Sequence, residues 1–64
     1  MKKLTQNEIN ILLLVSKGYN NKKIASELFI SYHTVKSHIA KIMKQLNAAD
    51  RTNAVYIAVK HKII

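Results

Sequence analysis

Four side chains between positions 33 and 40 have the types that read the edges of DNA base pairs. Lysine donates to guanine N7 and O6, serine donates or accepts, and an alanine methyl group can lie against a thymine methyl. Lys36, Ser37 and Ala40 fall on one side of a predicted helix, and His33 is exposed near its start. We therefore predict base contacts from His33, Lys36, Ser37 and Ala40.

A second group of residues is suited to DNA phosphate. Asn21 and Thr34 lie at or near the starts of predicted helices, where free backbone amides favour anions. Lysines that contact phosphate set the register of a protein on the duplex without reading its sequence. The predicted phosphate contacts are Asn21, Lys22, Lys23, Thr34, His38, Lys41 and Lys44.

Several of these assignments have an ordinary structural alternative. Thr34 can also act within the cap of its own helix. His38 borders the predicted core residue Ile39, so a hydrogen-bonded structural role is the alternative to a phosphate contact. Each lysine taken singly could be a solvated side chain. Tyr19 and Tyr32 could add hydroxyl donors, although packing is the more ordinary role for Tyr19.

The charge balance indicates a polyanionic partner. Eleven Lys and Arg residues against three Asp and Glu residues give a formal charge of +8 on 64 residues, which suits nucleic acid or an anionic membrane surface. A solubilising basic surface is the alternative. The longest apolar run, Ile11–Val15, is far shorter than the roughly 20 residues that span a bilayer, and it lacks the form of a signal peptide. We expect a cytoplasmic protein that binds double-stranded DNA and no membrane.

The same composition disfavours catalysis and metal binding. The chain has no cysteine, and its three histidines are scattered with few carboxylates nearby. It has no nucleophile–base pair and no glycine loop that could cradle phosphate, and two of its three acids, Glu8 and Asp50, fit helix caps. We expect no enzyme activity, no cofactor, no metal and no small-molecule ligand within this chain.

Helical periodicity and capping residues predict an all-α, compact four-helix domain over residues 1–64. A first helix opens at Thr5, whose spacing to Glu8 has the form of a capping box, and it stops at Gly18. Asn20 or Asn21 caps a short second helix. The predicted core positions of these two helices are Ile9, Leu12, Leu13, Val15, Ile24, Ala25 and Leu28.

The third predicted helix, about 31–46, carries the candidate base contacts. Ser31 caps it, and apolar residues recur at spacings of four, three and four on its other side, which predicts one buried stripe. This stripe consists of Val35, Ile39, Ile42 and Leu46. Because only about three residues join this helix to the second one, the pair forms a helix-turn-helix. Asn47–Asp50 interrupts the pattern, and Asp50 can cap a fourth helix that runs to about Lys60.

The fourth predicted helix has two apolar faces. Its core face comprises Ala54, Val55 and Ala58. Tyr56, Val59 and Ile63 lie further round, and an exposed aromatic and aliphatic stripe indicates a partner surface. We predict a homodimer through this helix, with packing of the stripe on the first helix of a monomer as the alternative.

Six segments match a known pattern in order and spacing. They are Leu4-Thr5 with Glu8, Gly18–Ala25, Leu28–Ser31, Thr34–His38, Ile42 with Leu46, and Arg51–Val55. Together they resemble the LuxR/GerE (NarL/FixJ) helix-turn-helix domain, over residues 4–64. The stretch Ile24–Ser31 looks most like the small spore-type GerE regulators, and the turn of that family tolerates Phe29. The resemblance implies a third helix in the major groove, a dimer contact from the fourth helix, and the effector-domain role found in response regulators.

Three positions depart from the pattern of that family. Asn7 and Gln45 stand where arginine and lysine are usual, and Lys23 stands where glutamate is usual. We therefore expect an ion pair that is common in the family to be missing or rewired.

These features predict a sequence-specific DNA-binding transcription regulator that inserts its third helix in the major groove as a dimer. The alternative function is a protein-interaction module of the same fold that sequesters another regulator. A membrane-surface peptide is disfavoured, because the predicted helices carry paired core faces and the caps of a folded domain.

Overall fold

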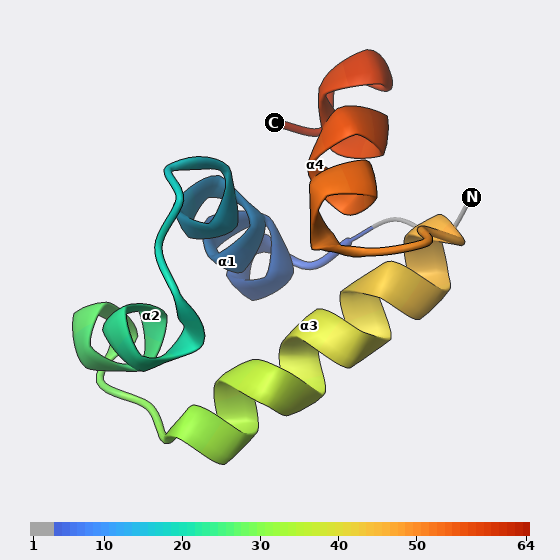
Figure 1. Cartoon of the computed structure of the whole chain (residues 1–64). Coiled ribbons are helices and arrows are strands. Elements are labelled where there is room, and N and C mark those ends of the chain that lie inside the picture. The colour runs from blue at the N-terminus through green and yellow to red at the C-terminus, as the bar shows by residue number, and fades with distance from the viewer. Residues whose placement is uncertain (1–3) are drawn as a thin grey trace.

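The computed structural model describes residues 4–64 and contains four helices in that range. They are α1 (Gln6–Ser16), α2 (Asn21–Leu28), α3 (Tyr32–Leu46) and α4 (Arg51–Lys60). α3 is the longest, and it runs along one side of the molecule with α1, α2 and α4 on the other (Figure 1). Only Phe29–Ser31 joins α2 to α3, so the predicted all-α fold with a helix-turn-helix is confirmed. Residues 1–3 of the predicted domain lie outside the described residues.

Each helix begins after a residue whose side chain caps it. The capping oxygen accepts a hydrogen bond from the amide three residues later, which satisfies a donor that has no partner inside the helix. The four capping residues are Thr5, Asn20, Ser31 and Asp50. The predicted capping box is complete, since Glu8 N donates to Thr5 Oγ1 at 3.2 Å and Thr5 N donates to Glu8 Oε1 at 2.8 Å. Each such cap stabilises the domain by ~1 kcal/mol.

Each helix also ends near a residue with a left-handed backbone. These residues are Gly18, Phe29, Asn47 and Lys62, with φ of +84°, +57°, +54° and +57°. The next amide then donates back to a carbonyl in the last turn of the helix, as Ile30 N does to Ala25 O at 3.1 Å. Gly18 adopts this backbone without strain and is the predicted stop of α1. Phe29 has a Cβ atom that disfavours it, and its side chain is 95% exposed.

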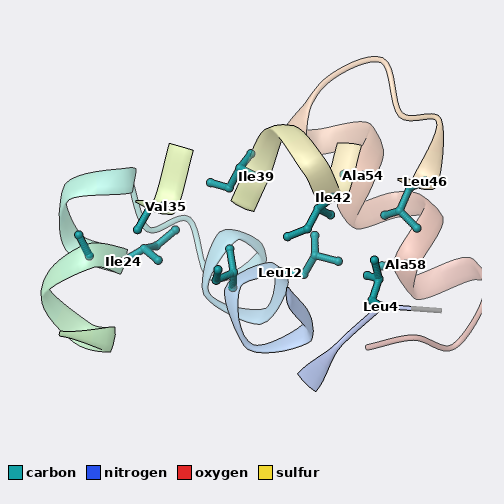
Figure 2. Packing of buried hydrophobic residues seen from close by; sticks show 11 residues of the cluster. Leu4, Leu12, Ile24, Val35, Ile39, Ile42, Leu46, Ala54 and Ala58 are labelled. Atoms are coloured by element: carbon teal, nitrogen blue, oxygen red, sulfur yellow. The ribbon is translucent and has the colours of Figure 1, made fainter. Parts of the chain in front are cut away.

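The core lies between α3 and the three other helices. The predicted stripe on α3 is buried along its whole length, with Val35 at 0%, Ile39 at 7%, Ile42 at 1% and Leu46 at 3% exposure. Figure 2 shows Ile24 of α2 beside Val35 at one end of this stripe, and Leu4 with Ala58 near Leu46 at the other. Because α1, α2 and α4 each contact α3, the stripe fixes the position of the whole helix.

The buried face of α1 differs from the predicted one. Ile11 and Leu12 are buried together with Glu8, whereas Leu13 is 40% exposed. Residues 11–14 are all apolar and span a full helical turn, so their type alone cannot select a face. Glu8 lies three residues before Ile11 and four before Leu12, a spacing that places it in the core line of α1.

The outer stripe of α4 is shorter than predicted. Tyr56 and Val59 are 61% and 57% exposed, but Ile63 is half-buried against the core. The left-handed backbone of Lys62 turns the chain back, and Ile63 N donates to Ala58 O at 2.7 Å. The exposed part of this face is therefore centred on Tyr56 and Val59.

Phe29→Gly is expected to stabilise the domain, because glycine adopts positive φ without steric cost and the exposed ring contributes little buried area. A gain of ~1 kcal/mol in the free energy of unfolding corresponds to a rise in Tm of roughly 4–8 °C for a domain of this size. Thermal unfolding followed by circular dichroism measures it. Asn47→Gly is the matched control, because asparagine already tolerates this backbone, and its Tm should change little. A fall in Tm for Phe29→Gly would mean that the phenyl ring makes a stabilising contact.

Candidate nucleic-acid interface

The face of α3 opposite the buried stripe is open to solvent. His33, Ser37, Ala40 and Lys44 follow one another at spacings of four, three and four and are all exposed, so they form one line along the helix. Lys36 is exposed at the margin of this line. In Figure 1 the other helices lie on one side of α3 and leave this side uncovered. The structure thus brings the four predicted base-contacting residues together on one exposed face.

The first turn of α3 adds aromatic groups to that face. Tyr32 is 47% exposed, and its ring meets the His33 ring edge-on with the centroids 6.1 Å apart. Lys36 Nζ lies 5.8 Å from the Tyr32 ring centroid, a distance at which an ammonium is attracted to an aromatic face. Lys36 is therefore held close to the start of α3 with its charge still accessible.

The first residues of α2, α3 and α4 border one surface hollow. Asn21, Tyr32 and Arg51 are those first residues, and Asn20 and Lys22 complete the lining. The lining offers amide, hydroxyl, ammonium and guanidinium groups without an acidic side chain. Donor groups of this kind suit an anion such as a DNA phosphate.

Arg51 links this hollow to the rest of the molecule. Its Nη1 donates to Asn21 Oδ1 at 2.6 Å and its Nη2 donates to Tyr19 O at 3.2 Å. Arginine has donors only, so it fixes the amide oxygen of Asn21 toward itself and leaves the amide NH₂ group as the free donor. Arg51 also connects α4 with α2, two helices that do not pack directly against each other among the described residues.

Sequence reasoning did not assign a role to Arg51. The residue is part of the Arg51–Val55 segment that carries the family resemblance, which is the one signal that pointed to it. Its partners Asn21 and Tyr19 are 30 and 32 residues away, and no periodicity within a helix connects such positions.

Lys23 and Tyr19 pair beside the same helix start. Lys23 Nζ lies 4.3 Å from the Tyr19 ring centroid, and Tyr19 also packs partly against the core. Tyr19 therefore has the packing role that was the alternative to phosphate contact. Lys23 remains exposed, so its ammonium is accessible from solvent.

On the side of α3 that faces α1, two predicted phosphate contacts are half-buried. Thr34 N donates to Ser31 Oγ at 3.0 Å, and the two hydroxyl oxygens lie 2.8 Å apart, so Thr34 does take part in the cap of α3. His38 lines a hollow between α1, the end of α2 and α3, together with residues such as Asn10 and Ile30. This location is closer to the structural alternative for His38 than to the exposed line of α3.

Lys41 lies near Glu8, the one buried acidic residue within residues 4–64. Its Nζ is 3.9 Å from Glu8 Oε2, although the lysine side chain is 61% exposed and that of Glu8 only 2%. Gln45, one turn further along α3, has a buried Oε1 atom without a hydrogen-bond partner. Because Gln45 is neutral, the cation beside Glu8 is Lys41.

The acidic residues offset little of the positive charge on the surface. Of the three in the chain, Glu8 is buried and Asp50 accepts from Asn53 N at 2.8 Å as the cap of α4. Glu27 on α2 is the remaining one, and it is exposed. Within residues 4–64, no helix is long and apolar enough to cross a membrane, and no three His, Asp or Glu residues cluster as metal ligands.

Comparisons of sequence and structure show which known proteins this chain resembles. The family described as bacterial regulatory proteins, luxR family, matches residues 2–58. The response regulator protein VraR of Staphylococcus aureus, like that of Staphylococcus epidermidis, is 48% identical over 61 residues, which are 95% of this chain and 29% of the relative. The crystal structure of response regulator ChrA, of a heme-sensing two-component system, superposes with a TM-score of 0.94 and 36% identity, over 100% of this chain and 32% of that one. The chain therefore spans less than a third of the length of these relatives.

Asn21→Asp is expected to weaken binding to any DNA duplex while the fold persists. An aspartate oxygen still accepts from Arg51, but the NH₂ donor is replaced by an anionic oxygen that repels phosphate. Loss of one hydrogen bond to a charged group lowers affinity by roughly tenfold or more, measurable by fluorescence anisotropy at fixed salt. Asn10→Asp on α1 makes the same change of charge as a control. Equal losses for both variants would show that net charge, and not the Asn21 donor, is responsible.

Proposed function

We infer that this chain, which belongs to the luxR family of bacterial regulatory proteins, binds double-stranded DNA sequence-specifically and thereby regulates transcription. The observation that carries this function is the exposed line of α3, with His33, Ser37, Ala40 and Lys44 opposite the buried stripe. A major groove about 12 Å wide admits an α-helix. α3 offers that groove donors, small side chains and positive charge, while its other side is held by the core.

Direct reading of bases is assigned to the first three turns of α3. Lys36 is the strongest candidate, because its ammonium can donate to guanine N7 and O6 and Tyr32 keeps it near the start of the helix. Ser37 and Ala40 are small enough to bring the helix backbone close to the base edges, and His33 is positioned to reach the same groove.

Contacts to phosphate fix the orientation of α3 on the duplex. The proposed groups are Asn21, Lys22, Lys23, Thr34, His38, Lys41 and Lys44. Those at the start of α2 are supported best, because the hollow beside Asn21 and Lys22 is lined by donors. Thr34 and His38 are half-buried and would contact phosphate only along the edge of the interface.

α4 is the proposed surface for a second copy of the chain. Tyr56 and Val59 expose apolar area on adjacent turns, and Lys60 Nζ lies 6.0 Å from the Tyr56 ring centroid. Two copies joined in this way would place two copies of α3 on half-sites about one helical turn apart. We propose that the chain lies in the bacterial cytoplasm, where its DNA partner is found. There it serves as the output domain of a response regulator. Its proposed activity is binding and not catalysis.

Lys36→Ala and Lys44→Ala are expected to weaken DNA binding in different ways. Loss of Lys36 should reduce affinity for the selected sequence by roughly 5- to 100-fold and relax its preference over scrambled DNA. Loss of Lys44 should weaken all sequences alike and lower the slope of log affinity against log salt by about 1. Electrophoretic mobility shift assays with a duplex selected from a random library measure both effects.

Two results would contradict these roles. If both variants lower binding to the selected and scrambled duplexes by the same factor, Lys36 does not read bases. If neither variant changes DNA binding, the outer face of α3 does not contact DNA. The alternative of a module that sequesters another regulator is then favoured.

A further inference from the structure

The charge of Glu8 is not explained by its role in the cap of α1. Glu8 Oε1 accepts from Thr5 N at 2.8 Å, a role that glutamine fills equally well in a capping box. The second oxygen, Oε2, is buried and has no hydrogen-bond partner. A buried carboxylate is costly unless a cation compensates it, and the cation beside Oε2 is Lys41, with Nζ at 3.9 Å.

Lys41 has an ammonium that is accessible to two anions, the Glu8 carboxylate and a DNA phosphate. Its stem belongs to the side of α3 that faces α1, but 61% of its side chain is exposed and the residue is a proposed phosphate contact. Lys44, less than a turn further along α3, is exposed too, and no acidic side chain lies within 4 Å of it among the described residues. Lys41 therefore has a carboxylate beside its ammonium, whereas Lys44 on the outer line of α3 has none within this distance.

Gln45 cannot compensate the charge of Glu8, so among the described residues this charge depends on Lys41. Residues four apart on a helix are neighbours on one face, so Gln45 lies beside Lys41 on the α1 side of α3. Its side chain is neutral and half-buried, with an Oε1 atom that also lacks a partner. The charge of Glu8 is consequently balanced by a lysine that the DNA interface also needs.

We propose that Glu8 is a positioning residue that limits DNA affinity by drawing the Lys41 ammonium toward α1. DNA phosphate must then compete with a buried carboxylate for this lysine, and Lys41 contributes less to binding than Lys44 does. Because phosphate contacts act on every sequence, this restraint lowers affinity for all DNA and leaves more of the selectivity to the base-reading side chains. The inference rests on the proposed DNA-binding function.

Glu8→Gln tests this directly, because it removes the charge and keeps an oxygen for Thr5 N. We expect affinity for any duplex to rise by roughly two- to fivefold and the salt dependence to become steeper, by at most about 0.9 in the log–log slope per subunit. In a Lys41→Ala background the gain from the same substitution should shrink to that of removing one negative charge elsewhere on the domain. A gain in affinity cannot arise from partial unfolding, so it separates this role from a structural one.

Two further variants complete the experiment. Glu27→Gln removes the same formal charge from an exposed site on α2, and any gain it gives should be unchanged by Lys41→Ala. Gln45→Lys leaves the capping box intact and offers Glu8 a second ammonium, so it should tighten binding in a way that depends on Lys41. This variant decides the question if Glu8→Gln fails to fold.

The outcomes are distinct. The proposal is overturned if Glu8→Gln folds and does not tighten binding, or if its gain persists undiminished without Lys41. Where Glu8→Gln does not fold, the proposal is overturned if the gain of Gln45→Lys is undiminished without Lys41. Wild-type protein that shows no salt-dependent binding to duplex DNA would instead refute the proposed function, and the inference with it. Salt-dependent binding of the wild type with equal effects of Lys41→Ala in both Glu8 backgrounds refutes only the inference.

Discussion

One buried line of α3, formed by Val35, Ile39, Ile42 and Leu46, holds the other three helices in place. A chain of 64 residues without cysteine has no disulfide to support its small core. Its stability therefore depends on a helix that contacts α1, α2 and α4 along one side. Because all three partners lie on that side, the opposite side stays uncovered (Figure 1). The packing that stabilises the fold thus also leaves the proposed recognition surface open to solvent.

Charge is organised around the same helix. Of the three acids, one is buried and one caps α4, so the excess positive charge faces solvent with little opposition. Two polar links between helices then act on the candidate phosphate contacts. Arg51 turns the Asn21 amide so that its donor is free, whereas Glu8 attracts the Lys41 ammonium. In the proposed interface, the first link frees a donor for phosphate and the second draws a lysine away from it.

Local signals in the sequence were sufficient for most of the fold. The stripe of α3 and the caps at Thr5, Ser31 and Asp50 each depend on residues within one or two turns, and the structure confirms them. The face of α1 could not be chosen in this way, because the five consecutive apolar residues Ile11–Val15 fit any orientation and a charged residue, Glu8, takes a core position.

Contacts between distant segments could not be predicted, because local signals in the sequence do not connect them. The bonds of Arg51 to Asn21 and Tyr19 join positions 30 and 32 residues apart, and Glu8 meets Lys41 only because α1 packs on α3. The resemblance to the luxR family led us to expect a missing or rewired ion pair, but it did not indicate that Lys41 lies beside Glu8. The groups of the proposed interface could thus be listed from sequence, while the bonds that orient them required the fold.

The central claim is that the outer face of α3 is the surface that enters DNA. Titration of the ¹⁵N-labelled protein with a selected duplex, followed by backbone amide chemical shifts, tests it most directly. We expect the largest shifts at His33, Ser37, Ala40 and Lys44 and at the start of α2, with small shifts at the buried Ala54 and Ala58. Shifts confined to α1 and α4, with α3 unaffected, would contradict the account.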